Sequence, residues 1–335
     1  MSDVPARARR FARSAVLALK PVVESRWARL ALMAASLLAA ALLVRHSLRD
    51  VAAGEVISSL RRQPAWTIAA SVLLTVISYG CLGGQEWFAL RLMGRRRPLE
   101  RTLLASAMGN ALSNLMGFGL ASGSAVRLRL YRWARLRPRD IAVLVLLFSL
   151  ATYLTGIVTM GLAGLVAFQP IAAASRWPAA AVAVVCLLLL APAAIWFLPL
   201  PKAFRRRRRA RRPEISGSDR VWALAAGIGD WVFSGAALYV LSAQGWTGLP
   251  EFLAIFCLGS LVGAAVGVPG GIGVLEAAVL GLRAHDLAHQ TAAALIAYRA
   301  IYFIIPFLLA AAGMAVAQVR RAARTLKASA GEAGK

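Results

Sequence analysis

Long apolar runs alternate along this chain with clusters of arginine, and this alternation constrains the fold more than any single motif. Most of the runs reach the length that a helix needs to cross a bilayer, about 20 residues. They lie near residues 30–44, 66–93, 103–125, 140–168, 178–199, 221–242, 251–284 and 291–319. Hydrophobic residues make up 59% of the 335 positions, which is typical of a helical membrane protein with several spans and excludes a soluble enzyme.

The basic residues indicate which loops face the cytoplasm. The net charge is +25, and the arginines gather between apolar runs, including RRRRRARR at 205–212. This is the pattern of cytoplasmic loops beside an anionic leaflet, so we expect no nucleic-acid partner. Residues 1–29, the loop 202–220 and the tail 321–335 are therefore predicted to be cytoplasmic, with both termini on that side. We expect the first run to be a span rather than a cleaved signal peptide.

The run at 251–284 is broken near its middle by the sequence GVPGGIGVLEAAVL at 267–280. Pro269, Gly270, Gly271 and Gly273 interrupt any helix that enters this stretch, and Glu276 falls in the first turn of the helix that follows. Such a break is tolerated at membrane depth only inside protein or beside water. We therefore predict a re-entrant hairpin that lines a cavity, with both ends outside because few basic residues flank it.

The run at 103–125 is flanked on both sides by arginine clusters, at 91–101 and 127–139. A single crossing would place one cluster outside, whereas a hairpin that enters and returns keeps both in the cytoplasm. We therefore predict a second re-entrant hairpin, broken at Gly117, Gly119 and Gly123.

The predicted elements follow the same order twice, as span, span, hairpin and span, in halves at about 30–168 and 178–319. Three crossings per half invert the second half relative to the first. Arg127 precedes Tyr153 by the same number of residues as Glu276 precedes Tyr302, which supports a repeat. The predicted fold is an all-α polytopic membrane protein, with about six full spans plus two re-entrant helical hairpins arranged as an inverted-topology repeat. Residues 30–320 form its transmembrane domain, in the architecture of secondary transporters.

Four motifs resemble one family in the same order along the chain. They are SYGCLGGQEWFAL from Ser78, GNALSNLMGFGLASGSAVRLRLYRWARLRPRDIA from Gly109, PGGIGVLE from Pro269 and YRAIYFIIP from Tyr298. The resemblance is to the membrane domain of bacterial phosphatidylglycerol lysyltransferases, which also occurs alone in lysylphosphatidylglycerol synthase-like membrane proteins. It implies a flippase of the bacterial inner membrane that moves aminoacylated phosphatidylglycerol from the inner to the outer leaflet.

Two departures from this family qualify what the resemblance implies. The two-function members add a large soluble domain that transfers the amino acid from tRNA, and no such domain follows the last run. We therefore expect no synthase activity and leave a separate lipid synthase open as a partner. Glu86 stands where the family leads us to expect an aspartate. Other lipids, including hopanoid-type lipids, remain open as cargo. A non-catalytic partner of a lipid-modifying assembly and an intramembrane transferase are the alternative functions.

Charged residues in or beside the runs are the candidates for binding an anionic or aminoacylated phospholipid. Guanidinium groups suit a phosphodiester and carboxylates suit an ammonium group. The predicted substrate-binding residues are Arg127, Arg129 and Arg299 for phosphate, Glu86, Asp230 and Glu276 for amine, and Tyr302. Simpler interpretations stay open for most of them. Arg127 and Arg129 could extend to the cytoplasmic surface, Glu276 could only cap its own helix, and Arg299 with Asp230 could form a structural ion pair.

The sequence indicates neither a cofactor nor a metal site. His285 and His289 have a spacing that suits a metal, but no third ligand is evident. The three cysteines lie within apolar runs, and no phosphate-binding loop of the GxxxxGK type occurs, which argues against coupling to ATP. Asn110 and Asn114 are expected to line the first hairpin or, as we prefer, to hydrogen-bond its other leg. Self-association is left open.

Overall fold

The computed structural model describes a bundle of helices. The described residues are 57–59, 61–95, 97–116, 127–128, 130–131, 136–197, 216–242, 248–266, 271, 273–281 and 288–316, and this part contains no strand. The predictions for residues 1–44, 202–215 and 321–335, and for Gly117, Gly119, Gly123, Arg129, Pro269, Gly270 and His285, fall outside it. The helices are α4 (Ala65–Leu92), α5 (Leu99–Met116), α7 (Pro138–Val166), α8 (Phe168–Ser175), α9 (Ala179–Leu188), α10 (Ala191–Phe197), α12 (Gly217–Tyr239), α13 (Leu249–Val266), α14 (Val274–Gly281), α15 (Ala288–Arg299) and the π-helix η4 (Ala300–Ile304).

Five helices of the described part are long and apolar enough to cross a membrane: Ala65–Leu92, Pro138–Val166, Gly217–Tyr239, Leu249–Val266 and Gln290–Val316. Four of them coincide with runs predicted as full spans, which confirms an all-helical protein with several candidate spans. A sixth is counted if Phe168–Ser175 and Ala179–Ala194 form one broken span.

The run predicted as a simple span at 178–199 is preceded by the short helix α8, from which the next helix turns away by 118°. Two residues explain the turn. Arg176 has a φ of 59°, a left-handed conformation that ends α8, and Pro178 is the N-cap of α9. Beyond the turn, α9 runs back along α7, where Gly164 lies against the Sγ atom of Cys186 and Gly161 lies against its carbonyl oxygen.

Local sequence signals fix where two of the long helices begin. At the start of α12, the hydroxyl of Ser216 accepts a hydrogen bond from the Asp219 amide at 3.1 Å, and the Asp219 carboxylate accepts one from the Ser216 amide at 3.2 Å. This capping box satisfies amide groups that the first turn of a helix leaves without partners. Pro138 opens α7, and Asp140 in its first turn accepts a hydrogen bond from the Arg137 amide at 3.3 Å.

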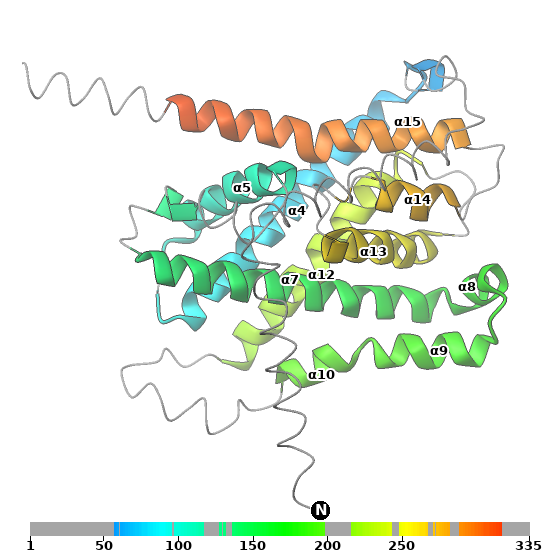
Figure 1. The fold of residues 1–335 in the computed structure, drawn as a ribbon, viewed down its shortest axis with the longest axis horizontal. Coiled ribbons are helices and arrows are strands. Elements are labelled where there is room, and N and C mark those ends of the chain that lie inside the picture. The colour runs from blue at the N-terminus through cyan, green and yellow to red at the C-terminus, as the bar shows by residue number, and fades with distance from the viewer. Residues whose placement is uncertain are drawn as a thin grey trace, which may run out of the picture.

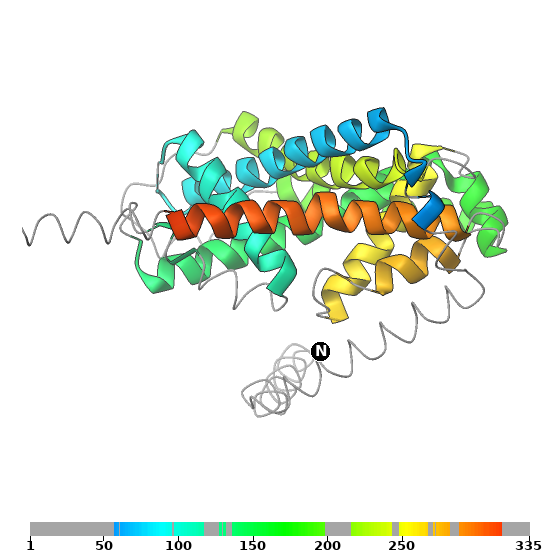
Figure 2. The ribbon, with the colours of Figure 1, turned by 90° about the horizontal axis from the view of Figure 1, so that it is seen from above.

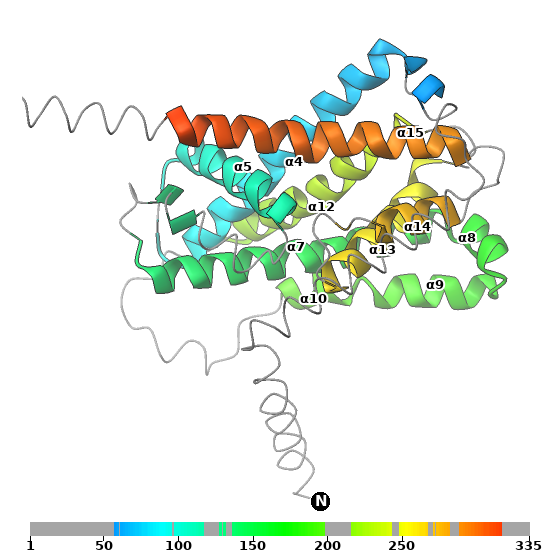
Figure 3. The ribbon, with the colours of Figure 1, turned by 45° about the horizontal axis from the view of Figure 1, so that its top comes forward.

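The helices α4 and α12 run side by side between two outer layers of helices (Figure 1). Figure 1 shows α7 on one side of them and the long helix that begins with α15 on the other. Small residues allow the close approach, since Gly84 of α4 lies against Ala226 of α12, and Gly156 of α7 lies against the ring of Trp231. The helix α5 lies toward one end of the long axis and the pair α13–α14 toward the other (Figures 2 and 3).

The pair α13–α14 is an antiparallel hairpin. Gly259 of α13 lies against Leu275 and Ala278 of α14, and nearer the tip Gly263 lies against the backbone of Gly271. The main hydrophobic core surrounds this hairpin and contains a chain of stacked and edge-on rings from α12 through η4, formed by Tyr239, Phe252, Phe256, Trp231, Tyr298, Tyr302 and Phe303. Large apolar side chains also face outward, among them Leu73 on α4, Leu150 on α7 and Leu309 on the last helix, as expected for surfaces that contact lipid tails.

Candidate functional site

Glu86 and Arg127 form an ion pair that is closed off from solvent. The Arg127 guanidinium donates from Nε to Oε1 of Glu86 at 2.8 Å and from Nη2 to Oε2 at 2.7 Å. Only 2% of the Arg127 side chain and none of the Glu86 side chain is exposed. Two parallel hydrogen bonds of this kind are the strongest arrangement that a guanidinium and a carboxylate make.

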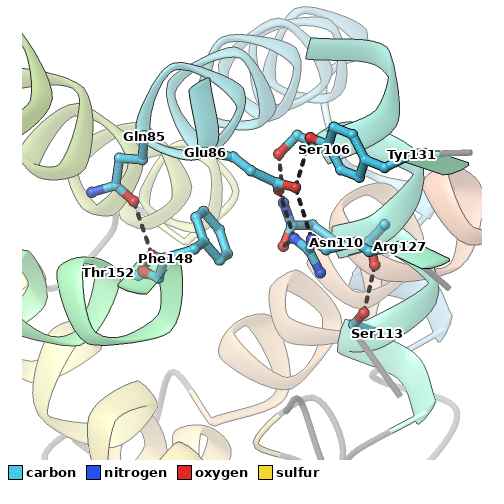
Figure 4. Close-up of polar contacts among 10 residues, drawn as sticks. Gln85, Glu86, Ser106, Asn110, Ser113, Arg127, Tyr131, Phe148 and Thr152 are labelled. Atoms are coloured by element: carbon cyan, nitrogen blue, oxygen red, sulfur yellow. Dashed lines mark hydrogen bonds and ion pairs between the residues drawn. The ribbon is translucent and has the colours of Figure 1, made fainter. Parts of the chain in front are cut away.

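Side chains from α5, from α7 and from the segment around Tyr131 also contact this pair. Tyr131 donates its hydroxyl to Oε1 of Glu86 at 2.8 Å, and Asn110 of α5 accepts a further hydrogen bond from Arg127 Nη2 at 3.0 Å (Figure 4). Ser106, one turn before Asn110 on α5, hydrogen-bonds Glu86 and accepts from the Asn110 amide at 3.0 Å. The guanidinium also lies over the ring of Phe148 on α7, at 5.1 Å from its centre. The pair therefore joins α4, α5, α7 and the segment that carries Arg127 and Tyr131.

This geometry corrects one interpretation of the sequence. Arg127 does not extend to the cytoplasmic surface, because its charge is satisfied inside the protein by a carboxylate on α4. Both residues were predicted as ligands of opposite headgroup charges, and here each is the partner of the other. Asn110 hydrogen-bonds Arg127, which follows the run predicted as the first hairpin, and the hairpin itself stays a prediction because residues 117–126 lie outside the described part.

A second ion pair, between Glu276 and Arg299, lies beside the break between α13 and α14. Arg299 donates from Nε to Oε1 of Glu276 at 2.8 Å, and its Nη2 lies 2.7 Å from the same oxygen. Arg299 also lies over the ring of Phe303, at 4.9 Å from its centre. In contrast to the first pair, 13% of the Glu276 side chain and 16% of the Arg299 side chain remain exposed.

The backbone at the break holds Glu276 in place. Gly271 and Gly273 have φ angles of 63° and 85°, a left-handed region that glycine enters without the steric cost of a Cβ atom. In this conformation the Gly273 amide donates to Oε2 of Glu276 at 2.7 Å. Glu276 does cap the start of α14, as its first-turn position suggested, but its other oxygen binds Arg299. Capping and ion pairing therefore occur together.

Asp230 is the second buried acid of the described part, near the middle of α12, and its partners are hydroxyl groups. Ser78 of α4 donates to Oδ1 at 2.5 Å, and the Ser78 hydroxyl lies 2.9 Å from the Tyr302 hydroxyl. Tyr79 donates its hydroxyl to the Tyr302 carbonyl at 3.1 Å. The suggested structural pair of Asp230 with Arg299 is wrong, since Arg299 binds Glu276 and Asp230 binds Ser78.

The π-helix η4 connects the second ion pair to Asp230. Arg299 of the ion pair and Tyr302, which hydrogen-bonds Asp230, lie within one turn of each other. The π-helix directly follows Arg299 and contains Tyr302, which is 6% exposed. A π-helical turn inside an α-helix is rare and is found frequently at functional sites. Because Arg299 and Tyr302 are fixed to the same turn, a change in its winding would alter their relative directions.

Several residues of these clusters did not stand out in the sequence. Ser78, Ser106 and Tyr131 contact the predicted acids, and Gln85 of α4 accepts a hydrogen bond from Thr152 of α7 at 2.9 Å. A signal was present, because Ser78, Gln85 and Glu86 fall on neighbouring positions of one buried helix face within an apolar run. Within the described residues, no three His, Cys, Asp or Glu side chains come close enough to hold a metal ion.

Comparison with known proteins identifies the family of this chain and two of its relatives. Residues 29–310 match the family described as "Lysylphosphatidylglycerol synthase TM region". The uncharacterized protein slr0712 of Synechocystis sp. is 30% identical over 244 residues, which cover 71% of this chain and 76% of that protein. The inner membrane protein YbhN of Escherichia coli is 27% identical over 255 residues, which cover 72% of this chain and 77% of that protein. The chain therefore belongs to the lysylphosphatidylglycerol synthase TM region family and is a multi-pass membrane protein.

Proposed function

We propose that this protein is a flippase of the bacterial inner membrane, which moves a lipid with a charged headgroup between leaflets. The Glu276–Arg299 pair carries the proposal, because two opposite charges lie, still partly exposed, beside a helix break in an apolar protein. Ionisable groups at membrane depth commonly mark the path of a polar substrate. The cargo that we favour is aminoacylated phosphatidylglycerol, whose headgroup carries both a phosphate and an ammonium group.

The pair suits such a cargo because the headgroup would replace each partner by a group of the same charge. A phosphate would take the place of Glu276 beside the Arg299 guanidinium, and an ammonium would take the place of Arg299 beside the Glu276 carboxylate. Neither buried charge is left without a partner during the exchange, which avoids a cost of several kcal/mol per ion. The capping contact from the Gly273 amide would keep Glu276 oriented while Arg299 moves away.

The transport mechanism that we favour uses two re-entrant hairpins related by an inverted repeat. The order of helices supports it, since a long helix, a hairpin helix and another long helix occur as α4, α5 and α7 and again as α12, α13 and the helix from α15. After each hairpin helix comes a charged residue, Arg127 or Glu276, that forms an ion pair with another helix. In transporters of this architecture, the repeats rock against each other around the substrate.

A topology experiment tests the hairpins directly. Reporters fused after Gly94, Arg135 and Lys202 and at the C-terminus should report cytoplasm, and fusions near Gly245 and Arg283 should report the outside. Reporters at residues 94 and 135 on opposite faces would turn the first hairpin into an ordinary span and remove the inverted repeat.

The function is tested by lipid labelling in cells. A strain that lacks the protein should hold a normal total amount of aminoacylated phosphatidylglycerol but expose less of it to a membrane-impermeant amine reagent. Glu276→Gln should fail to restore exposure at matched protein levels, because it removes the charge but keeps the size of the side chain. Arg299→Lys should restore it only partly, since lysine lacks the planar fork.

Glu100→Gln is the matched control for Glu276→Gln. Both glutamates lie in the first turn of a helix, but Glu100 is exposed on α5. The control should behave like the wild type. Equal labelling with and without the protein would remove this cargo, and a non-catalytic partner of a lipid-modifying assembly, or a carrier of another lipid such as a hopanoid-type lipid, would become the better assignment.

A further inference from the structure

Two acids are buried in the described part, Glu86 and Asp230, and of these only Asp230 has neutral partners. Its side chain is 6% exposed, and none of the ion pairs in this part of the chain includes it. Burial without a cation disfavours the charged carboxylate, whereas hydrogen bonds from hydroxyl groups favour it. A carboxyl group held between these opposing effects is suited to exchange a proton, as the acids of membrane proton relays do.

We infer that Asp230, Ser78 and Tyr302 form a proton-binding site that controls the π-helix carrying Arg299, and thereby couples lipid movement to a proton gradient. This inference rests on the proposed flippase function for its second half only. Binding of the proton itself is a property of Asp230 and its hydroxyl partners, and it can be measured without any lipid transport.

The hydrogen bonds of the cluster reverse when the proton binds. With Asp230 ionised, Ser78 donates to Oδ1 at 2.5 Å, so the Ser78 oxygen is open to accept from the Tyr302 hydroxyl 2.9 Å away. A proton taken from water converts the carboxylate into a carboxylic acid, whose O–H then donates to Ser78. Ser78 in turn donates to the Tyr302 hydroxyl, and the hydrogen bond between Tyr302 and the Asp230 side chain no longer involves an ionised carboxylate. No bond other than the O–H of Asp230 is made.

This reversal acts on η4 because Tyr302 belongs to it. Two contacts with α4 hold Tyr302: its hydroxyl meets Ser78, and its carbonyl accepts from Tyr79 at 3.1 Å. Hydrogen bonds to an ionised carboxylate are roughly twice as strong as those between neutral groups, so protonation of Asp230 weakens the hold on a π-helical turn, which is rare compared with an α-helical one. A return to α-helical winding turns the residues on one side of η4 by about 100° relative to the other, because successive α-helical residues are that far apart around the axis. Arg299 would then leave Glu276.

The other titratable groups facing Asp230 come from three elements. They are Tyr79 and Cys81 of α4, Cys257 of α13, and Tyr298 and Tyr302 of the α15–η4 helix. Phenols and thiols do not ionise in this setting as readily as a carboxyl group. The charged groups nearest to this cluster, Glu276 and Arg299, act on Tyr298 and are paired with each other. Asp230 is therefore the group that takes the proton.

Infrared spectroscopy of the full chain in nanodiscs of phosphatidylglycerol and phosphatidylethanolamine tests proton binding. The wild type should show a component of the protonated-carboxyl C=O band that grows as the pH falls and that is missing from the titration of Asp230→Asn. Asp219→Asn is the matched control on the same helix, since Asp219 is paired with Arg91 at 2.7 Å, and it should keep the band. A band that is unchanged in Asp230→Asn, or one that responds to sodium and not to pH, overturns the inference.

A second measurement tests the coupling. Proteoliposomes of the same two lipids, with a fluorescent phosphatidylglycerol as probe, are treated with an impermeant quencher while a pH gradient is imposed in either direction. Wild-type probe movement should change several-fold when the gradient is reversed, and Asp230→Asn should give equal rates in both directions. Gradient-independent movement in the wild type overturns the coupling. If no probe moves at all, the proposed function fails for this lipid, and the infrared titration still decides whether Asp230 binds a proton.

Discussion

The two arginine–glutamate pairs have the same chemistry but different surroundings. In the pair Glu86–Arg127 the guanidinium nitrogens meet both carboxylate oxygens, and the side chains are 0% and 2% exposed. In the pair Glu276–Arg299 both nitrogens meet one oxygen, a backbone amide takes the other, and 13% and 16% of the side chains are exposed. The first pair has no room for a third group, whereas the second could admit a headgroup. The comparison supports a structural role for the first pair and is the basis on which we propose a binding role for the second.

The largest effect should come from breaking the sealed pair. Glu86→Ala leaves the Arg127 guanidinium buried without its carboxylate, so the free energy of unfolding should fall by about 3–5 kcal/mol. Thermal unfolding of the purified protein in detergent measures the change. The double variant Glu86→Leu with Arg127→Met should recover part of it, because an apolar pair of similar volume carries no unpaired charge, although Tyr131, Asn110 and Ser106 lose their partners. A double variant as unstable as the single one would show that the loss comes from these neutral partners and not from an unpaired buried charge.

The next largest effect should come from the backbone that supports the open pair. Gly273 has a φ of 85°, so Gly273→Ala should lower the free energy of unfolding by about 1–2 kcal/mol, the cost of a Cβ atom in a left-handed conformation. Because the Gly273 amide orients Glu276, lipid export should fall further than stability does. Gly217→Ala at the start of α12 is the control, since an added Cβ atom there meets no other atom. Equal lipid export by Gly273→Ala and Gly217→Ala would show that the backbone at the helix break does not support the proposed binding site.

The sequence predicted the helices that carry the two ion pairs better than it predicted the contacts between those helices. The apolar runs located the long helices, because bilayer crossing sets their length and composition. The first-turn position of Glu276 predicted its cap, since capping is local. The partner of Arg127 could not be read from the chain, because Glu86 is brought to it by the packing of α4, α5 and α7. The π-helix at residues 300–304 has no periodic signal in the sequence, and it carries Tyr302, which contacts Ser78 and Asp230.

A smaller loss of stability should follow from removing the charge of the open pair. Glu276→Gln keeps an oxygen for the Gly273 amide and leaves Arg299 partly solvated, so the free energy of unfolding should fall by about 1 kcal/mol, near the upper range for exposed pairs. Export of a cationic lipid should nevertheless be largely lost. Thermal unfolding and outer-leaflet labelling are both measured for Glu276→Gln and for Glu86→Gln, with the two variants prepared in the same way. If Glu276→Gln were as unstable as Glu86→Gln, the Glu276–Arg299 pair would have a structural role like that of the Glu86–Arg127 pair.

The smallest effect should come from a pair at the surface, which sets the lower end of the scale. Arg95 lies 3.1 Å from Asp140, and their side chains are 43% and 25% exposed. Water solvates both groups whether or not they meet, so Arg95→Ala should change the free energy of unfolding by about 0.5 kcal/mol, and less at high salt. Asp140 keeps its contact with the Arg137 amide in this variant, so the start of α7 is preserved. If Arg95→Ala were as damaging as Glu86→Ala, burial could not be what separates the pairs, and the binding role of Glu276–Arg299 would lose its physical basis.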